Sequence, residues 1–453
     1  MHSDVIIVGG GPAGIITALT AKSVNPERSV ALIKSIGDGV IPCAIPYMID
    51  TLADPAKNAM GHAPLTQSGV EVVVDSVISI NRDRRAIELK AGGELTYEKL
   101  VLATGTRSTL PGIPGIGLKG VYTIRKSMSA MTSLRGELRD AHDVVIIGGG
   151  FIGCEFADEL SRIDGLAIHL VELESHLLTG AFDIDLCEEA AEILRQEGVR
   201  VHLGESVKSI NGEGAVESVT LTDGTVIDAD AVVIGIGARP ESTLARDAGL
   251  RITDGGSIWV DDYMRTTDPN VFAVGDCALK RDFFTRKETP VLLASTATAE
   301  ARIAGTNLFS IRVMRQIQGT IAAFSTKIGD TCFGSAGMTQ RVCRGEGIRT
   351  VTATASAPDR HPGVLPGAKL LKVTLVFADR AGILLGGQMS GGPSVGELIN
   401  AVALGIQKRI TVRELDMMQI ATHPMLTPAP TVHPLINAAH MALAKLRAGT
   451  FDG

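Results

Sequence analysis

The 453-residue sequence lacks most features of a membrane, nucleic-acid-binding or secreted protein. No apolar run approaches the roughly 20 residues of a membrane-spanning helix. The formal net charge of −7 excludes a strong electrostatic attraction to nucleic acid or to an anionic membrane. Residues 1–4 lack the basic and apolar regions of a signal peptide. We therefore expect a cytoplasmic protein with neither a membrane nor a nucleic acid as its partner.

The cysteines are few and scattered, with no Cys-x-x-Cys pair and no spacing typical of a zinc site, so no metal is predicted. They are Cys43, Cys154, Cys187, Cys277, Cys332 and Cys343. Cys43 differs from the others because it lies between Pro42 and Pro46. A proline suits the first turn of a helix, and the positive end of a helix dipole favours a thiolate. This pattern predicts a reactive thiolate at a helix start, and a small buried thiol is the alternative.

The N-terminal region has the pattern of a dinucleotide-binding unit. An apolar strand over 4–8 runs into a glycine-rich turn, an alanine-rich helix that ends near residue 24, and a second strand over 30–33. Gly9, Gly11 and Gly14 match Gly-x-Gly-x-x-Gly, in which the second glycine lets a pyrophosphate approach and the third lets helix and strand pack closely. Lys34 stands at the end of the second strand, where an acidic residue that binds a ribose hydroxyl is expected.

The same pattern restarts at residue 143. A strand over 143–147 leads into a second complete fingerprint, a helix that ends near residue 163, and a strand over 167–171 that ends in Glu172. This spacing places a carboxylate on an adenosine ribose, and the absence of a following arginine favours NAD(H) over NADP(H). An exposed acid at a strand end is the alternative role. A helix over 183–196 and strands over 199–203 and 231–237 complete the unit.

Two dinucleotide folds in one chain predict a bound flavin and a diffusing nicotinamide. Segments 100–105 and 267–276 each have the pattern of a strand that ends in a glycine turn. Asp276 in the second turn can accept hydrogen bonds from polyol hydroxyls, and a helix N-cap is its alternative role. In the C-terminal third, we expect strands over 319–324 and 369–377 and an amphipathic helix over 394–405.

The two fingerprints, Ala103-Thr104-Gly105 and the 271–276 stretch together resemble the pyridine nucleotide–disulfide oxidoreductases over essentially the whole chain. The segment 42–47 resembles their single-cysteine branch of coenzyme A-disulfide reductases, NADH oxidases and NADH-dependent persulfide reductases. The resemblance implies an α/β protein with two Rossmann-like domains and a C-terminal α+β dimerisation domain, assembled as a homodimer. The implied segments are an FAD domain over 1–112 and 246–317, an NAD(H) domain over 113–245 and the dimerisation domain over 318–453.

The resemblance also implies the cofactors and their contacts, with NADH favoured over NADPH. The FAD contacts are Gly9, Gly11, Pro12, Ala13, Gly14, Lys34, Cys43, Thr104, Gly105, Gly275 and Asp276. The NADH contacts are Gly148, Gly150, Phe151, Ile152, Gly153, Glu155, Glu172 and Gly237. Glu155 matches a family glutamate that lies near the flavin and nicotinamide rings.

The implied catalytic residues are Cys43, Tyr47 and His423. Tyr47 could hydrogen-bond a sulfur or a substrate, and simple packing is its alternative role. His423-Pro424 lies in a loop that crosses to the partner subunit's cysteine in the family, and it resembles the His-Pro whose histidine is the acid–base partner of the thiol in the two-cysteine branch. A surface or capping histidine is the alternative, because His433-Pro434 repeats the dipeptide.

The predicted reaction passes electrons from NADH through FAD to Cys43 and then to a low-molecular-weight disulfide, persulfide or polysulfide. Coenzyme A disulfide is disfavoured, because Thr20 and Lys22 stand where the family has arginines, and Thr422 and Leu426 where it has a tyrosine. Pro12 replaces the histidine of NADH peroxidases. The alternatives are an NADH oxidase that reduces oxygen, an electron-transfer flavoprotein that serves a protein acceptor such as rubredoxin, and a redox sensor.

Overall fold

The structure is a computed structural model that describes residues 2–314 and 319–452. The chain forms two compact units, each assembled from three segments. Unit 1 comprises Met1–Pro111, Thr123–Glu137 and Gly237–Thr320, and unit 2 comprises Gly112–Tyr122, Leu138–Ile236 and Ile321–Gly453. The predicted division into an FAD, an NAD(H) and a C-terminal domain stays a prediction, and its boundary between 317 and 318 lies outside the described residues. Within those described ranges, no helix has both the length and the apolar character needed to cross a bilayer.

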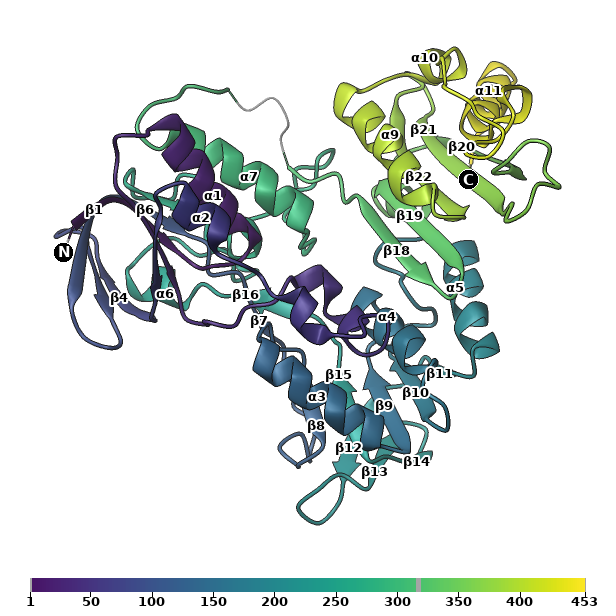
Figure 1. Cartoon of the computed structure of the whole chain (residues 1–453). Coiled ribbons are helices and arrows are strands. Elements are labelled where there is room, and N and C mark those ends of the chain that lie inside the picture. The colour runs from purple at the N-terminus through teal and green to yellow at the C-terminus, as the bar shows by residue number, and fades with distance from the viewer. Residues whose placement is uncertain (1, 315–318, 453) are drawn as a thin grey trace. The chain divides into compact units, whose positions relative to one another are not determined.

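Unit 1 is built on a seven-stranded sheet in the order β3-β2-β1-β6-β5-β4, with β17 also paired to β6 (Figure 1). Strands β3, β2, β1, β6 and β17 run parallel to one another. Strand β5 pairs antiparallel with the start of β6, and β4 pairs antiparallel with β5. The central stretches of these strands, Val5–Val8, Val30–Ile33, Leu100–Leu102 and Val271–Ala273, are apolar and buried, as expected of parallel strands covered on both faces, whereas the edge strand β3 is partly exposed. The strands are β1 His2–Val8, β2 Val30–Lys34, β3 Glu71–Val74, β4 Val77–Asn81, β5 Ala86–Leu89, β6 Glu94–Leu102, β7 Thr106–Ser108, β16 Ala238–Pro240 and β17 Val271–Ala273.

The helices of unit 1 pack through small residues. Helices α1 and α7 lie side by side (Figure 1), and a Cβ at Gly305 would lie only 2.8 Å from the Cβ of Thr20. A larger residue there would push the two helices apart. The helical segments are α1 Pro12–Val24, η1 Pro42–Ala44, η2 Pro46–Met48, η3 Pro55–Asn58, α2 Ala63–Gln67, α6 Thr243–Asp247, η4 Gly275–Cys277 and α7 Ala294–Asn307, with α3 Met128–Asp140 and strand β8 Val121–Thr123 shared between the segments of both units.

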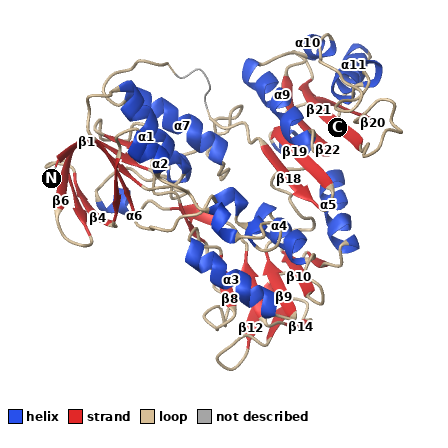
Figure 2. Cartoon of the chain, viewed as in Figure 1, coloured by secondary structure: helices blue, strands red, loops and turns tan. Residues whose placement is uncertain are grey.

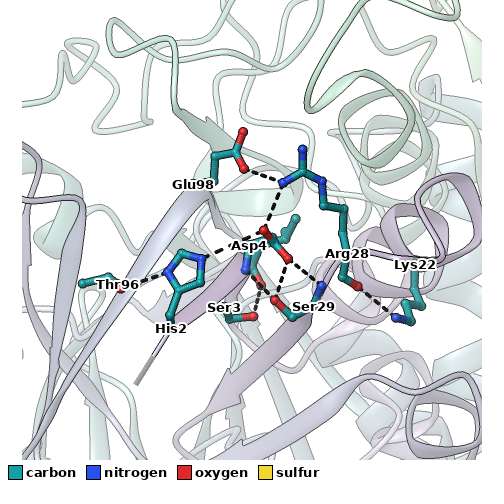
Figure 3. Close-up of polar contacts among 9 residues, drawn as sticks. His2, Ser3, Asp4, Lys22, Arg28, Ser29, Thr96 and Glu98 are labelled. Carbon is teal, nitrogen blue, oxygen red and sulfur yellow. Dashed lines mark hydrogen bonds and ion pairs between the residues drawn. The ribbon is translucent and has the colours of Figure 1, made fainter.

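The start of β1 is held by a polar network around Asp4 (Figure 3). Its carboxylate accepts hydrogen bonds from the backbone N–H and the hydroxyl of Ser29, at 2.8 and 2.7 Å, and from Arg28 at 3.0 Å. Burial opposes ionisation of Asp4, but these hydrogen bonds outweigh it and lower the pKa of the carboxyl to about 2. Asp4 therefore joins β1 to the residues that precede β2.

Lys22, at the C-terminal end of α1, has a structural role that the same view shows (Figure 3). Its ammonium donates hydrogen bonds to the carbonyl oxygens of Pro26 and Arg28, at 2.8 and 2.9 Å. Both carbonyl groups lie in the loop between the end of α1 at Val24 and the start of β2 at Val30. Lys22 thus stabilises the reversal of the chain between α1 and β2.

Unit 2 contains a parallel sheet, a small antiparallel sheet and a C-terminal antiparallel sheet (Figure 2). The orders are β11-β10-β9-β15-β8, β12-β13-β14 and β18-β19-β22-β21-β20. The strands are β9 Asp143–Ile147, β10 Ala167–Glu172, β11 Arg200–Leu203, β12 Val207–Asn211, β13 Ser218–Leu221, β14 Val226–Asp228, β15 Ala231–Ile234, β18 Phe324–Ile328, β19 Thr331–Gly337, β20 Thr350–Pro358, β21 Leu370–Ala378 and β22 Leu384–Gly391. The helical segments are α4 Phe151–Leu160, α5 Ile184–Gln196, α8 Gln340–Gly345, α9 Val395–Lys408, α10 Val412–Asp416, η5 Pro430–Val432 and α11 Pro434–Arg447. The predicted α/β class, with a C-terminal α+β part, is confirmed.

Acidic residues at the start of α5 and along it connect the part of unit 2 that contains the parallel sheet to the C-terminal antiparallel sheet. The backbone N–H of Asp183 donates to Gln388 Oε1 at 2.8 Å. Two residues further on, in the first turn of α5, Asp185 accepts from Lys372 Nζ at 2.6 Å. The next turn repeats the contact, because the hydroxyl of Ser390 donates to a side-chain oxygen of Glu189 at 3.0 Å. These contacts explain why the two parts behave as one compact unit.

One predicted strand is wrong. Residues 319–323 form an irregular segment, and strand β18 begins only at Phe324. Gly319 and Ala322 have φ angles of +83° and +51°, which a β-strand does not allow. The predicted strand over 369–377 and helix over 394–405 are present as β21 and α9, shifted by one to three residues.

Candidate active site

The first glycine turn has one open position between two crowded ones. A Cβ at Gly9 would lie 2.0 Å from the carbonyl oxygen of Ala103, and a Cβ at Gly14 would lie 1.9 Å from that of Gly9. Gly11, the N-cap of α1, has nothing within 4 Å of its ideal Cβ position. The turn is therefore a cradle with backbone on one side and space on the other, which fits a bound pyrophosphate.

The predicted FAD contacts that follow strands β6 and β17, namely Thr104, Gly105, Gly275 and Asp276, lie around this turn. A Cβ at Gly275 would lie 2.7 Å from the Cβ of Ala13, so the turn that carries Asp276 lies against the start of α1. The hydroxyl of Thr104 donates to the carbonyl of Glu241 at 2.5 Å, and Gly105 has a φ of +69°. Asp276 lies inside η4, whose N-cap is Val274, so the helix N-cap that was its alternative role is wrong.

A buried ion pair that the sequence did not reveal supports the Gly-Asp turn. Lys280 and Glu300 are 2% and 3% exposed, and their charged groups are 2.9 Å apart. Glu300 also accepts from the backbone N–H of Gly275 at 3.1 Å, and Lys280 donates to the Gly275 carbonyl at 2.6 Å. The pair thus forms hydrogen bonds with both the backbone N–H and the carbonyl oxygen of Gly275, the residue that precedes Asp276. Removing one partner would leave a buried charge unpaired.

The second glycine turn repeats the geometry of the first. A Cβ at Gly148 would lie 2.9 Å from backbone atoms of Gly235, and a Cβ at Gly153 would lie 1.8 Å from the Gly148 carbonyl oxygen. Gly150, the N-cap of α4, is open. Two nucleotide cradles of the same form are therefore present, one in each unit.

Glu172 is tied into the second turn. Its carboxylate accepts from the backbone N–H of Gly149 at 2.5 Å and from that of Glu174 at 2.7 Å. Glu172 is partly buried, so its alternative role as a merely exposed acid does not describe it. A carboxylate has about four lone-pair positions, so capacity remains for ribose hydroxyl donors.

The remaining predicted NADH contacts have diverse surroundings. Phe151 stacks on Phe324 with ring centroids 5.1 Å apart, and Ile152 is 41% exposed. Gly237 has a φ of +93° and belongs to unit 1, whereas the other predicted NADH contacts belong to unit 2.

Cys43 lies in a tight turn and not at the start of an α-helix. Pro42–Ala44 and Pro46–Met48 are successive three-residue 3₁₀ helices, so Pro42 does begin a helical turn as predicted, but the turn does not continue into a longer helix. Each proline begins one turn, and the second stops the first from extending because it supplies no N–H. A three-residue turn has no appreciable dipole, so the dipole argument for a thiolate falls. The Cys43 side chain is nevertheless exposed.

Asn58 and Arg135 hold the Cys43 turns from outside. Asn58, which is 2% exposed, accepts from the Ile41 backbone N–H at 3.0 Å and donates from its side chain to the Ile41 carbonyl at 3.2 Å. Arg135 donates to the carbonyl oxygen of Ile49 at 3.1 Å. Neither residue carries a motif, so the sequence offered no signal for either role.

The other five cysteines are less suited to thiolate chemistry. Cys154, Cys187, Cys277 and Cys343 are buried, and Cys332 is half-buried. Burial raises the pKa of Cys154 well above its ordinary value, that of Cys187 to about 12, and those of Cys277 and Cys332 upward. Among the cysteines that the structure describes, Cys43 is therefore the one whose thiol is exposed.

The two His-Pro dipeptides differ in their surroundings. His423 is exposed, and its Nδ1 accepts from the backbone N–H of Met425 at 3.2 Å, which leaves Nε2 to carry the ring proton. His433, the N-cap of α11, is 4% exposed, and burial lowers its pKa. Tyr47 is half-buried in η2. Only His423 of the two histidines can reach a solvent-exposed substrate.

Glu155 carries a carboxyl group that titrates near neutral pH. It lies on α4, partly buried, and accepts a hydrogen bond from the hydroxyl of Thr326 at 2.7 Å. Burial raises the pKa of Glu155 to about 7, with smaller contributions from the carboxylates of Asp158 and Glu159, and the Thr326 hydrogen bond opposes the rise. The carboxyl can therefore hold or release a proton in the physiological range.

This raised pKa has a measurable effect on stability. Between the ordinary pKa of 4.5 and about 7, the folded state binds more protons than the unfolded state, so Glu155 lowers stability as pH rises through this window. We expect Glu155→Gln to raise Tm relative to the unmodified protein by about 2–4 °C at pH 8 and by much less at pH 5. The control is Glu192→Gln on the exposed face of α5. An equal change in Tm at both pH values would contradict the assignment.

Comparison with known proteins agrees with this geometry. The family model for pyridine nucleotide-disulphide oxidoreductases matches residues 3–301, and the model for their dimerisation domain matches residues 298–433. The chain is 32% identical to an NADH oxidase of Methanocaldococcus jannaschii, over 97% of this chain and 99% of that one. It is 30% identical to an NAD(P)H coenzyme A polysulfide/persulfide reductase of Pyrococcus horikoshii, over 97% and 98% of the two chains.

Solved structures give the same result. A NAD-dependent persulfide reductase from A. fulgidus superposes with a TM-score of 0.89 at 27% identity, over 99% of this chain and 84% of that one. Its fold and the full-length sequence matches place this chain in the NADH oxidase and persulfide reductase group of NAD(P)H-dependent flavin oxidoreductases. The chain belongs to the pyridine nucleotide-disulphide oxidoreductase family.

Proposed function

We propose that the chain transfers electrons from NADH, through bound FAD, to Cys43 and then to a low-molecular-weight disulfide, persulfide or polysulfide. The observation that carries the proposal is the exposure of Cys43 in a chain whose other cysteines are buried or half-buried. A thiol must be exposed to attack a substrate sulfur, and burial slows that attack by suppressing the thiolate. The relatives with persulfide reductase names support the same acceptor class.

The residues present fit FAD. The open cradle at Gly11 leaves room for a pyrophosphate, and Asp276, on the neighbouring turn, offers a carboxylate to polyol hydroxyls. The cofactor, when bound, accepts a hydride from NADH and passes an electron pair to a disulfide bond. Cys43 belongs to the same compact unit as this cradle.

The proposed step at Cys43 is thiol–disulfide exchange. The Cys43 thiolate attacks one sulfur of the substrate, a new S–S bond forms, the substrate S–S bond breaks, and the departing thiolate takes a proton. The electron pair from NADH then cleaves the mixed disulfide, which restores the Cys43 thiolate and releases the second thiol after protonation. The balance is one disulfide, one NADH and one proton to two thiols and one NAD⁺. With a persulfide, one of the two products is hydrogen sulfide.

Oxygen is the second candidate acceptor, because the Methanocaldococcus relative is named an NADH oxidase. In that reaction Cys43 would pass through a sulfenic acid, which a thiol at an exposed position can form. A homodimer is proposed with either acceptor, supported by the match of residues 298–433 to a dimerisation domain.

The role of Cys43 is testable with Cys43→Ser. We expect this variant to keep reduction of the flavin by NADH but to lose more than about a hundredfold of disulfide or persulfide turnover, because no thiolate can form the mixed disulfide. After each protein has been incubated with the disulfide and the excess removed, anaerobic titration with NADH should show two electron pairs per flavin in the unmodified protein, one for the flavin and one for the Cys43 mixed disulfide, and one pair in the variant. Cys332→Ser is the matched control. Full sulfur-acceptor turnover by Cys43→Ser would show that Cys43 is dispensable and would overturn the thiol mechanism.

NADH preference is proposed from the carboxylate of Glu172, which would repel a 2′-phosphate. Leu173, the next residue, is 68% exposed. We expect the pair Glu172→Gln and Leu173→Arg to shift the ratio of kcat/KM for NADPH over NADH by at least about tenfold, because a negative charge is replaced by a positive one. The Gln retains an acceptor for the Gly149 N–H, and Leu173→Gln alone is the control. An unchanged ratio would refute the ribose-binding role.

His423 is proposed as the proton donor to the departing thiolate at the partner subunit's active site. We expect His423→Asn to slow sulfur-acceptor turnover by about 10²-fold and to remove the histidine limb from its pH profile, since Asn donates no titratable proton. His142→Asn, at an exposed histidine of unit 2, is the control. A pH–rate profile that His423→Asn leaves unchanged would end this assignment.

A further inference from the structure

Lys34 is a buried cation at the edge of the first nucleotide cradle. It is the last residue of β2 and only 5% of it is exposed. Its aliphatic stem lies against the glycine turn, because a Cβ at Gly10 would lie 2.8 Å from the Cβ of Lys34. Lysine is almost never buried to this extent without a polar partner, so its position requires an explanation.

The second nucleotide fold has a residue in the equivalent position. There, a Cβ at Gly149 would lie 3.0 Å from the Cβ of Glu172, the last residue of β10. Lys34 and Glu172 thus stand in the same relation to their glycine turns, each at the end of the second strand. In dinucleotide folds this is the place of the residue that binds the adenosine ribose. Lys34 therefore occupies a ribose position with a cation in place of a carboxylate.

The hydrogen bonds of Lys34 leave one donor for a ligand. Its ammonium donates to the carbonyl oxygen of Gly37 at 3.3 Å and to Nε2 of His62. Burial, with a smaller effect of Lys34 itself, lowers the pKa of His62, which is consistent with a neutral ring that accepts at Nε2. An ammonium has three N–H groups, and the contacts within the described residues use two of them.

We propose that Lys34 binds the adenosine ribose of FAD as a hydrogen-bond donor, and that His62 orients its ammonium. The ribose hydroxyl accepts from Lys34, whereas it would donate to a carboxylate at the same position. The inference rests on the FAD of the proposed function, but it concerns binding of the cofactor and not the electron acceptor.

The test measures FAD binding to the full-length protein from which the flavin has been removed, by flavin fluorescence. The ligands are FAD and its 2′-deoxyadenosine and 3′-deoxyadenosine analogues. We expect the unmodified protein to bind one of the analogues about ten- to a hundredfold more weakly than FAD, the loss of one charge-assisted hydrogen bond. Lys34→Met, which keeps the stem against Gly10, should bind FAD more weakly by a similar factor and lose nothing further with that analogue.

Two further variants control the experiment. Lys22→Met removes an ammonium that also holds two carbonyl groups in unit 1 but lies at the other end of α1, and it should leave the affinity for FAD unchanged. His62→Asn should weaken FAD binding less than Lys34→Met does. Equal affinity of the unmodified protein for all three ligands would overturn the proposal, and this comparison needs no variant to fold. Additive losses from Lys34→Met and the deoxy analogue would also overturn it. Failure of FAD itself to bind would instead refute the proposed function.

Discussion

Both nucleotide cradles depend on a backbone approach that only glycine allows. The third glycine of each fingerprint, Gly14 or Gly153, brings its helix so close to the preceding strand that a Cβ would lie within 2 Å of a carbonyl oxygen. Such an atom cannot be accommodated by a side-chain adjustment, because its neighbour is backbone. The close packing fixes the helix N-terminus at the strand end, and the second glycine of each fingerprint, Gly11 or Gly150, has open space beside it. The side chains of Lys34 and Glu172 lie directly against the neighbouring glycines Gly10 and Gly149 because these turns are so compact.

The exposure of the Cys43 thiol has a different structural cause. Two prolines begin successive 3₁₀ turns, and the anchoring hydrogen bonds of Asn58 and Arg135 to Ile41 and Ile49 fix the segment from both ends. Cys43 is thereby held on a rigid turn with its side chain in solvent. What sets it apart from the other cysteines is exposure and not a helix dipole, since the other thiols are withdrawn from solvent and burial raises the pKa of four of them.

The sequence predicted those features that depend on local spacing. The fingerprints, Glu172 and the anomaly of Lys34 all lie at fixed distances along one strand–turn–helix–strand unit, so periodicity and glycine spacing locate them. The ion pair of Lys280 and Glu300 has no such pattern, because its purpose appears only when α7 packs beside η4. The false strand over 319–323 has the opposite cause: its composition favours β structure, but the left-handed backbone at Ala322 does not follow from composition.

The surroundings of Lys22 bear on which sulfur compound reaches Cys43. A coenzyme A acceptor carries phosphates, and the resemblance to coenzyme A-disulfide reductases implies basic residues on the first helix that would bind them. In this chain Thr20 instead packs against Gly305 of α7, and the ammonium of Lys22 holds the carbonyl oxygens of Pro26 and Arg28. Binding a phosphate with Lys22 would break two hydrogen bonds that stabilise the reversal after α1, so the gain would be reduced by their loss. Thr20 and Lys22 of the first helix thus serve packing and chain reversal, which supports the proposal of a small acceptor without a nucleotide.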